Sequence, residues 1–422
     1  MSVAYDPFSP EWRSNPYAKY RDLRDQAPVH YSPDSDTWCV SRYDDVLSVL
    51  NDPETFSSRA MFVMLMGRGQ TEPPPLSWKV LRFVAKIFWR TGMTPNGFAD
   101  ARNLIADDGA SHRDLRNTVN RGFTPRVIAA WEPRIREVAA ECVAGIRGDH
   151  PFELVHDFSV PLPVTIISEL LGVESERRAD FKRWSDVIVR SVSTPEGRAD
   201  PFSREMTDTF AELVRYLKKI THQRRKAPAD DLISAIVAHQ EGESGLDDYD
   251  VVSFVMLLLV AGNETTTNLI GNSVSALLDH PRQLEKLIAS PDLIAPTLEE
   301  ALRFDSPVQL LFRMATRDVD LHGVTIPEGA TVVPLIGSAN RDERQFPDPD
   351  RFDIERNPRA HLAFGFGEHF CLGSSLARLE ARCAMEALLP HLAGRTRSAE
   401  DREWLDSFLV RGPSRLELER AA

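Results

Sequence analysis

The chain has 422 residues, of which 42% are hydrophobic and 27% charged, a composition typical of a globular protein that can bury a sizeable core. Its 50 Lys and Arg residues against 63 Asp and Glu give a net charge of −13, which argues against a general nucleic-acid-binding protein. We expect a cytoplasmic protein without a transmembrane segment. The N-terminus lacks a signal-peptide pattern, and the longest apolar run, Val251 to Ala261, is too short to span a bilayer. The four cysteines show no C-x-x-C spacing, so they indicate neither a zinc site nor a disulfide framework.

The N-terminal part alternates between helical and extended patterns. Tyr17 to Asp25 has the spacing of an amphipathic helix, short strands are predicted at 28–31 and 37–40, and helical spacing returns over Asp44 to Leu50. No repeat and no low-complexity linker divides the sequence, so we predict a single domain over residues 1–422.

Residues 60–108 form an unusual stretch. After three consecutive prolines at 73–75, a helix without any acidic residue is predicted over 76–90. Its cations recur at steps of three or four residues and therefore share one helix face: Lys79, Arg82, Lys86 and Arg90. Three interpretations remain open, namely an ordinary amphipathic helix over the core, a lid over an apolar substrate, and a contact with a membrane surface or a partner.

Helical patterns dominate the middle of the chain. Shorter helices are predicted at 112–120, 127–146, 163–171, 176–191, 204–225 and 230–240. A longer helix begins at an N-cap cluster, Asp247 to Asp250, and continues through Leu278. Its first half is apolar nearly all round and must be buried, yet polar residues follow at 261–267. There Gly262 costs about 1 kcal/mol relative to alanine. Such a defect indicates either a functional use or polar groups satisfied by neighbouring helices.

The C-terminal third combines a short helix, short strands and an irregular segment. Glu300 and Arg303 are three residues apart on one helix face and can pair, although surface pairs of this kind are common. Strands are predicted at 313–316, 322–326 and 331–335. Residues 338–358 are rich in Pro and Asp, and they lead into the loop at 364–373.

That loop contains a single cysteine, Cys371, directly before a helical pattern. Unpaired amide donors and the helix dipole favour a thiolate there, and flanking glycines and phenylalanines suit a cysteine ligand beneath a porphyrin. The loop is not a dinucleotide fingerprint, because Phe370 occupies the place of the third glycine. A nucleophilic pair of Cys371 with His369 and an inert buried cysteine both remain alternatives on the loop alone.

Together these patterns resemble the cytochrome P-450 superfamily in its soluble bacterial form. The motif Phe-Gly-x-Gly-x-His-x-Cys-x-Gly is met at 364–373, Glu-x-x-Arg at 300–303, and the central-helix motif Ala/Gly-Gly-x-Asp/Glu-Thr-Thr at 261–266. The match covers nearly the whole chain in the right order. It implies a mainly α fold with a small β portion, in which the long central helix lies over haem b and the cysteine loop beneath it.

The resemblance also implies a role for each matching residue. Cys371 would be the axial thiolate ligand of the iron, and Glu264 and Thr265 would be the acid-alcohol pair that handles dioxygen and its protons. The other residues implied to contact the haem, four of them at its propionates, are His112, Arg116, Ala261, Arg313, Phe364, Gly365, His369 and Gly373. A structural ion network would consist of Glu300, Arg303 and Arg351. Substrate-lining positions would be Leu258, Val308, Leu310, Leu311, Leu409 and Val410, all apolar.

The implied activity is the insertion of one oxygen atom from O2 into a C–H or C=C bond of a lipophilic small molecule, such as a terpenoid, steroid, fatty acid, polyketide or aromatic compound. We expect a monomer without a fused reductase, which receives electrons from a separate ferredoxin or flavodoxin system at basic residues such as Arg113 or Arg121. The loop at 60–108 looks longer than usual for the family and is a candidate lid. The alternatives are a haem-thiolate peroxygenase or isomerase that does not activate O2, and a non-enzymatic haem sensor or carrier.

Overall fold

The computed structural model describes residues 3–61, 78–147, 150–193, 203–237 and 246–420. Two compact units are present, each assembled from segments that are distant in the sequence. The first unit contains Met1–Ala60, Pro125–Pro163 and Glu264–Ala422, and the second unit contains Met61–Thr124 and Val164–Asn263. The prediction of one domain over residues 1–422 stays a prediction.

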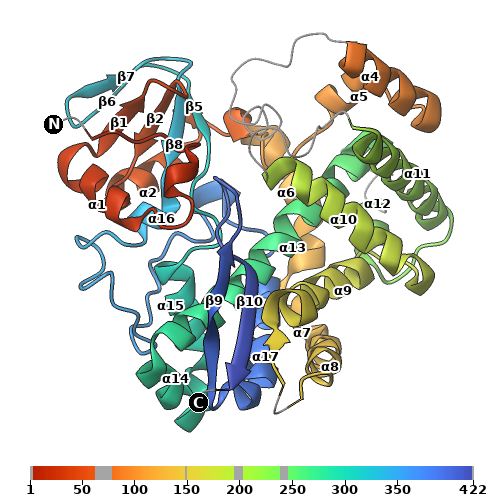
Figure 1. Cartoon of the computed structure of the whole chain (residues 1–422). Helices are drawn as coiled ribbons and strands as arrows, with labels where there is room; N and C mark the ends of the chain where they lie inside the picture. Colours follow the sequence, from red (N-terminus) through yellow and green to blue (C-terminus); the bar gives the residue numbers. More distant parts are fainter. Residues whose placement is uncertain (1–2, 62–77, 148–149, 194–202, 238–245, 421–422) are drawn as a thin grey trace. The chain divides into compact units, whose positions relative to one another are not determined.

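A five-stranded sheet organises one part of the first unit. Its strands follow the order β1 (Val29–Ser32), β2 (Thr37–Val40), β8 (Thr331–Pro334), β5 (Arg313–Ala315) and β3 (Phe56–Ser57), with β2 and β8 parallel and the other pairs antiparallel. The helices α1 (Tyr17–Gln26), α2 (Tyr43–Asn51) and α16 (Ile336–Ala339) accompany this sheet (Figure 1). Its core includes Val40, Val46 and Ile336, each at most 1% exposed. Both predicted N-terminal helices and both predicted strands are confirmed.

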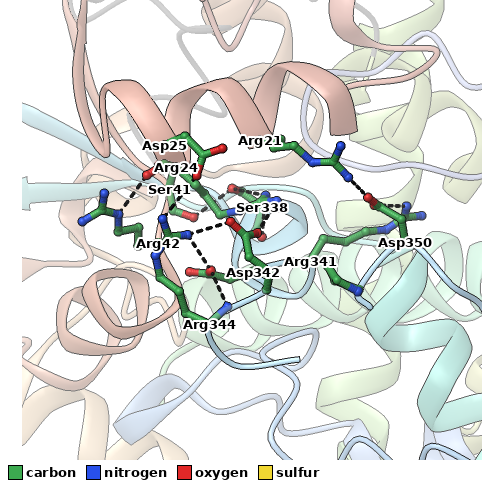
Figure 2. A network of polar contacts seen from close by, with 12 residues as sticks. Arg21, Arg24, Asp25, Ser41, Arg42, Ser338, Arg341, Asp342, Arg344 and Asp350 are labelled. Atoms are coloured by element: carbon green, nitrogen blue, oxygen red, sulfur yellow. Dashed lines mark hydrogen bonds and ion pairs between the residues drawn. The ribbon is translucent and has the colours of Figure 1, made fainter. Parts of the chain in front are cut away.

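A network of polar contacts holds the irregular segment after α16 in place (Figure 2). Arg24 of α1 is 1% exposed and donates to the carbonyl and the hydroxyl of Ser338, each at 3.2 Å. Asp342 accepts the backbone N–H of Tyr43 at 2.8 Å and thereby caps α2 from a distance of about 300 residues along the chain. Arg341 and Arg21 both bind Asp350. These long-range contacts order a segment whose sequence predicts no regular structure.

The helical part of the first unit is built on α17 (Ser374–Leu392). This helix packs against α8 (Glu132–Val143), α15 (Ile294–Phe304) and α7 (Pro125–Ala130). The helix predicted at 127–146 is therefore two helices, which separate at Trp131 because Pro133 has no backbone N–H for an uninterrupted ladder.

The remaining elements of the first unit are short or were not predicted. The helix α14 (Pro281–Ala289) follows the central helix, and β4 (Phe152–Glu153), β10 (Pro413–Arg420) and β9 (Arg395–Trp404) form a three-stranded sheet. The strand predicted from His322 begins later. His322 and Gly323 have φ angles of 51° and 76° and make the tight turn between β6 (Val319–Leu321) and β7 (Val324–Ile326).

The second unit consists mainly of helices. The helix α11 (Arg204–Lys226) contacts α4 (Trp78–Thr91), α10 (Arg178–Ser193) and α12 (Leu232–Val237). Its other helices are α5 (Pro95–Asp100), α6 (Gly109–Asn120) and most of α9 (Pro161–Leu170). Trp184 and Phe181 of α10 are fully buried and supply much of the core. None of the helices in the described ranges combines the length and apolar content that a membrane span requires.

The long helix α13 (Asp248–Asp279) contributes its first half to the second unit and its second half to the first unit. Asp247 and Asp250 cap it reciprocally, because each carboxylate accepts the backbone N–H of the other residue, at 2.9 and 3.1 Å. The predicted N-cap cluster is confirmed. With 32 residues the helix is about 48 Å long at a rise of 1.5 Å per residue.

Candidate functional site

The cysteine loop is a tight turn held by its own backbone. The N–H of Cys371 donates to the carbonyl of Phe364 at 2.9 Å, and the N–H of Phe370 donates to the carbonyl of Gly367 at 3.1 Å. Cys371 is half-buried and lies three residues before Ser374, the first residue of α17. The thiol thus lies close to the N-terminus of a 19-residue helix, where a thiolate is favoured.

Two glycines make this turn possible. Gly365 and Gly367 both have φ of +71°, a conformation that residues with a side chain rarely adopt. A Cβ on Gly367 would lie 2.9 Å from the carbonyl oxygen of Leu50 in α2, so no side chain fits there. A Cβ on Gly373, by contrast, would meet nothing within 4 Å. The loop is therefore packed on α2 on one side and leaves space beside the start of α17.

A half-buried ion cluster supports the loop from α15 and α17. Arg378 makes a bidentate contact with Glu299, at 2.6 and 3.0 Å, and His361 binds the same carboxylate at 2.9 Å. The guanidinium of Arg378 also lies 4.4 Å from the ring centroid of Phe364. Burial by itself raises the pKa of Glu299, but the hydrogen bonds from His361 and Arg378 bring it down to about 2. This cluster was not predicted from the sequence, where the adjacent glutamates at 299 and 300 were the available signal.

The predicted Glu300–Arg303 pair is present and fully buried. Two parallel hydrogen bonds of 2.8 Å join the two side chains, and Arg303 also donates to the backbone carbonyls of Asn340 and Pro349, at 3.1 and 2.8 Å. These contacts tie α15 to the segment that precedes the cysteine loop.

The prediction that Arg351 is the third member of that network is wrong. Its guanidinium is exposed and pairs with Asp353, and only its backbone carbonyl accepts a bond from Arg303, at 3.2 Å. The guanidinium that reaches Glu300 belongs to Arg356, at 3.1 Å. The reason is the course of the chain, because the backbone N–H of Asp353 already donates to Glu300 at 2.9 Å and the next turn brings the side chain of residue 356 back to it.

Two of the predicted propionate-binding side chains belong to the first unit. His369 bonds through Nε2 to the hydroxyl of Ser58 at 2.9 Å, and Arg313 of β5 is 4% exposed and donates to the carbonyl of Phe312 at 2.8 Å. The bond to Ser58 holds His369 within the cysteine-loop scaffold, and the nucleophilic pair of His369 with Cys371 stays an alternative.

Four predicted site residues belong to the second unit. His112 is fully buried on α6, and Arg116 follows one turn later on the same helix face and is half-buried. On α13, Leu258 is half-buried and Ala261 is exposed.

The helix α13 is irregularly packed where its polar residues begin. Asn263 donates to the hydroxyl of Ser185 at 3.2 Å, but its buried side-chain oxygen has no hydrogen-bond partner among the described residues. The hydroxyl of Thr267 donates to the carbonyl of Ser159 at 3.0 Å. Glu264 and Thr265 are half-buried. A Cβ on Gly262 would meet nothing within 4 Å. The glycine thus leaves open space beside the helix next to the predicted acid-alcohol pair.

The predicted lining residues of the first unit lie on two neighbouring strands of backbone. Val308 forms an antiparallel bridge with Val410, and the N–H of Gln309 donates to the carbonyl of Leu409 at 2.8 Å. Leu310 is 1% exposed and contributes to the core, whereas Val308, Leu311 and Leu409 are half-buried.

A second buried carboxyl on α17 was not predicted. Glu380 is 3% exposed, and burial raises the pKa of its carboxyl to about 8. This side chain is therefore mostly protonated and uncharged at neutral pH. A glutamate within an otherwise apolar helix face, nine residues after the cysteine, was the available signal.

The residues present fit a haem. Within the first unit, a cysteine near a helix N-terminus can bind the iron, and the buried Arg313 is a suitable partner for a propionate. Gly373 has open space where another residue would carry a side chain, as a flat group close to the backbone requires.

Comparison with known proteins gives the same result over the whole chain. A family model described as cytochrome P-450 matches residues 86–419. The vitamin D(3) 25-hydroxylase of Pseudonocardia autotrophica is 37% identical over 424 residues, which cover 98% of this chain and 95% of the relative. A solved cytochrome P-450 from Chondromyces apiculatus matches with a TM-score of 0.85 and 38% identity and covers 100% of this chain and 99% of that one. A solved cytochrome P-450 from Bacillus megaterium, in complex with corticosterone, matches with a TM-score of 0.81 and 34% identity and covers 98% and 100% of the two chains.

Proposed function

This chain belongs to the cytochrome P-450 family, and we propose that it hydroxylates a lipophilic molecule with several fused rings, using electrons from a separate ferredoxin or flavodoxin and its reductase. As a member of the family it is a monooxygenase with haem b as its cofactor. Its fold is mainly helical with a small β portion, as the sequence predicted.

Cys371 is the residue that would hold the haem iron. A haem with a cysteine thiolate ligand activates O2 and transfers one of its oxygen atoms to a substrate. The tight turn at 364–371 presents the thiol at a fixed position. The ion cluster of Glu299, His361 and Arg378 supports Phe364, the first residue of the loop. His112, Arg116, Arg313 and His369 would bind the propionates.

Glu264 and Thr265 would supply protons for the reaction. Both are half-buried on α13, beside the open space at Gly262. The hydroxyl of Thr265 can donate and accept at the same time, and the carboxylate of Glu264 can exchange protons with solvent because it is not fully buried. A hydroxyl that orients O2 and a carboxyl that resupplies protons suit a reaction that consumes O2.

The substrate class is inferred from the apolar lining and the relatives. Val308, Leu311, Leu409 and Val410 offer aliphatic surface with no charge, which favours a lipophilic ligand. One relative is named for its hydroxylation of vitamin D(3), and one matching structure holds corticosterone, so fused-ring compounds are the first class to test.

Electron transfer would take place through basic residues of the second unit. Arg113 on α6 and Arg121 directly after it are both exposed, in a chain whose net charge is −13. Such local positive charge suits an acidic ferredoxin or flavodoxin. Of the candidate lid at 60–108, residues 60–61 and 78–108, with α4 and α5, belong to the described part of the chain, and residues 62–77 lie outside it.

The experiment that tests this proposal combines binding with turnover. We expect steroids to shift the spectrum of the haem-loaded protein, and expect NADPH with ferredoxin and reductase to give a hydroxylated product whose oxygen comes from labelled O2. Product formation with hydrogen peroxide but not with the electron-transfer chain would identify a peroxygenase. A spectral shift without any product would identify a carrier or sensor.

A further inference from the structure

One face of the helix α4 packs firmly against α11, within the second unit. Ile87 is 5% exposed, and the ring of Phe83 lies 6.3 Å from the ring of Phe210 on α11. The ammonium of Lys86 binds Asp208 at 2.7 Å, and Arg90 binds the same carboxylate. These contacts fix the rotation of α4 about its own axis, so the side chains of the opposite face must point away from α11.

That opposite face carries large apolar side chains in water. Trp89 is 87% exposed, Trp78 79%, Phe88 49% and Leu81 48%. Their spacing of three, seven and one residues places them on a single stripe of the helix. They are four of the nine large hydrophobic side chains that are exposed in the described part of the chain, although α4 has only 14 residues. An apolar stripe this concentrated marks a surface that binds something.

The charged residues of α4 are all positive. Arg82 is exposed and adjoins the two tryptophans on the helix circumference, and α4 contains no acidic residue, while the chain as a whole has a net charge of −13. Tryptophan prefers the boundary between headgroups and acyl chains, and lysine and arginine extend their charged ends to anionic headgroups. Beyond about 8–10 Å the acidic remainder of the protein is screened at physiological salt.

We propose that the exposed face of α4, formed by Trp78, Leu81, Arg82, Phe88 and Trp89, docks the protein on the surface of an anionic lipid bilayer. The helix would lie in the plane of the headgroups, with the tryptophans inserted and Arg82 at the phosphates. Docking there would place a lipophilic substrate dissolved in the bilayer near the protein. The attachment itself does not depend on the proposed function.

Other occupants fit this face less well. A second copy of the chain would bring Arg82 toward the Arg82 of its partner, with no acid in either copy of α4 to neutralise them. An acidic protein partner would neutralise the charges, but it would have to offer a pocket for two tryptophans that protrude almost completely. A fluid bilayer accommodates both features without a preformed pocket.

The test is sedimentation of the full haem-loaded chain with vesicles. We expect it to pellet with phosphatidylcholine vesicles that contain phosphatidylglycerol, to pellet weakly with pure phosphatidylcholine, and to be released between about 0.1 and 1 M salt, over which the Debye length falls from about 10 to 3 Å. The double variant W78S/W89S should lower the affinity about tenfold or more, because it removes the two inserted rings, and R82E should weaken binding to the anionic vesicles. The matched control Y31S/I288S removes two exposed apolar side chains elsewhere and should bind like the unmodified protein.

Three results would overturn the proposal. The first is unchanged vesicle binding by W78S/W89S, provided that its melting curve and haem spectrum show a folded protein. The second is a vesicle-free dimer that W78S/W89S converts to a monomer, because the face would then bind a second copy. The third is a shift of tryptophan fluorescence to shorter wavelength when substrate is added to the unmodified protein without vesicles, together with no such shift in W78S/W89S. Helix α4 would then close over the protein's own site.

Discussion

The buried carboxyl of Glu380 makes the stability of the protein depend on pH, and Glu380→Gln removes this dependence. Burial raises the pKa of the carboxyl to about 8, whereas a glutamate in an unfolded chain titrates near about 4.3. Between these two values the folded protein holds a proton that the unfolded chain has lost. The group therefore causes no loss of stability below about pH 4.3, and it lowers the free energy of unfolding progressively as the pH rises to about 8.

The magnitude follows from the width of that window. Each pH unit within it is worth about 1.4 kcal/mol, so the full loss is about 5 kcal/mol and the loss from pH 6 to pH 8 is about 2 kcal/mol. Glutamine has nearly the same size and no proton to lose. We expect the unfolding free energy of the unmodified protein, minus that of Glu380→Gln, to fall by about 2 kcal/mol between pH 6 and pH 8. Urea titration at a series of pH values measures this difference.

Glu299→Gln is the matched control because its pKa moves in the opposite direction. Burial raises the pKa of Glu299, but the hydrogen bonds from His361 and Arg378 outweigh burial and hold it at about 2. Its stabilising contribution is therefore fully present above about pH 4.3 and is lost as the pH falls through about 2, and Glu299→Gln should cost about 3 kcal/mol at pH 7. A difference for Glu380→Gln that stays constant from pH 6 to pH 8 would refute the assignment of a buried neutral carboxyl.

The remaining predictions concern single side chains in the site. Thr265→Ala should retain haem but divert electrons to hydrogen peroxide, seen as NADPH consumption without product; full coupling would contradict its role with protons. Arg356→Ala should destabilise the protein by about 1.5–3 kcal/mol in urea titrations, because it removes one hydrogen-bond partner of a buried carboxylate that keeps Arg303, whereas Arg351→Ala should change stability by less than about 0.5 kcal/mol; equal effects would contradict the place of Arg356 in the ion network. Arg113→Glu should slow reduction by ferredoxin in stopped-flow measurements, and an unchanged rate would exclude docking there.

Local sequence patterns determined most of the helices and the position of the ligand loop. The cap of α13 was predictable because its residues lie within four positions of one another, and the glycines of the cysteine loop were predictable because their positive φ angles are a local requirement. The break of the 127–146 helix at Trp131 has a local cause as well, since Pro133 lies next to it.

Contacts between distant residues could not be predicted in the same way. Glu299 meets its partners 62 and 79 residues further along the chain, and a sequence does not show which of two arginines, Arg351 or Arg356, the backbone returns to Glu300. The segment at 338–350 is irregular in pattern, yet its contacts to α1 hold it in place (Figure 2). The burial of Glu380 likewise results from the helices packed around α17.

The absorption spectrum of the reduced protein with carbon monoxide tests most directly whether Cys371 is the ligand of the haem iron. We predict the strongly red-shifted band of thiolate ligation for the unmodified protein and its loss in Cys371→Ala, with a melting curve confirming that the variant is folded. A Cys371→Ala variant that keeps the band would contradict the assignment, as would an unmodified protein that binds haem without showing it.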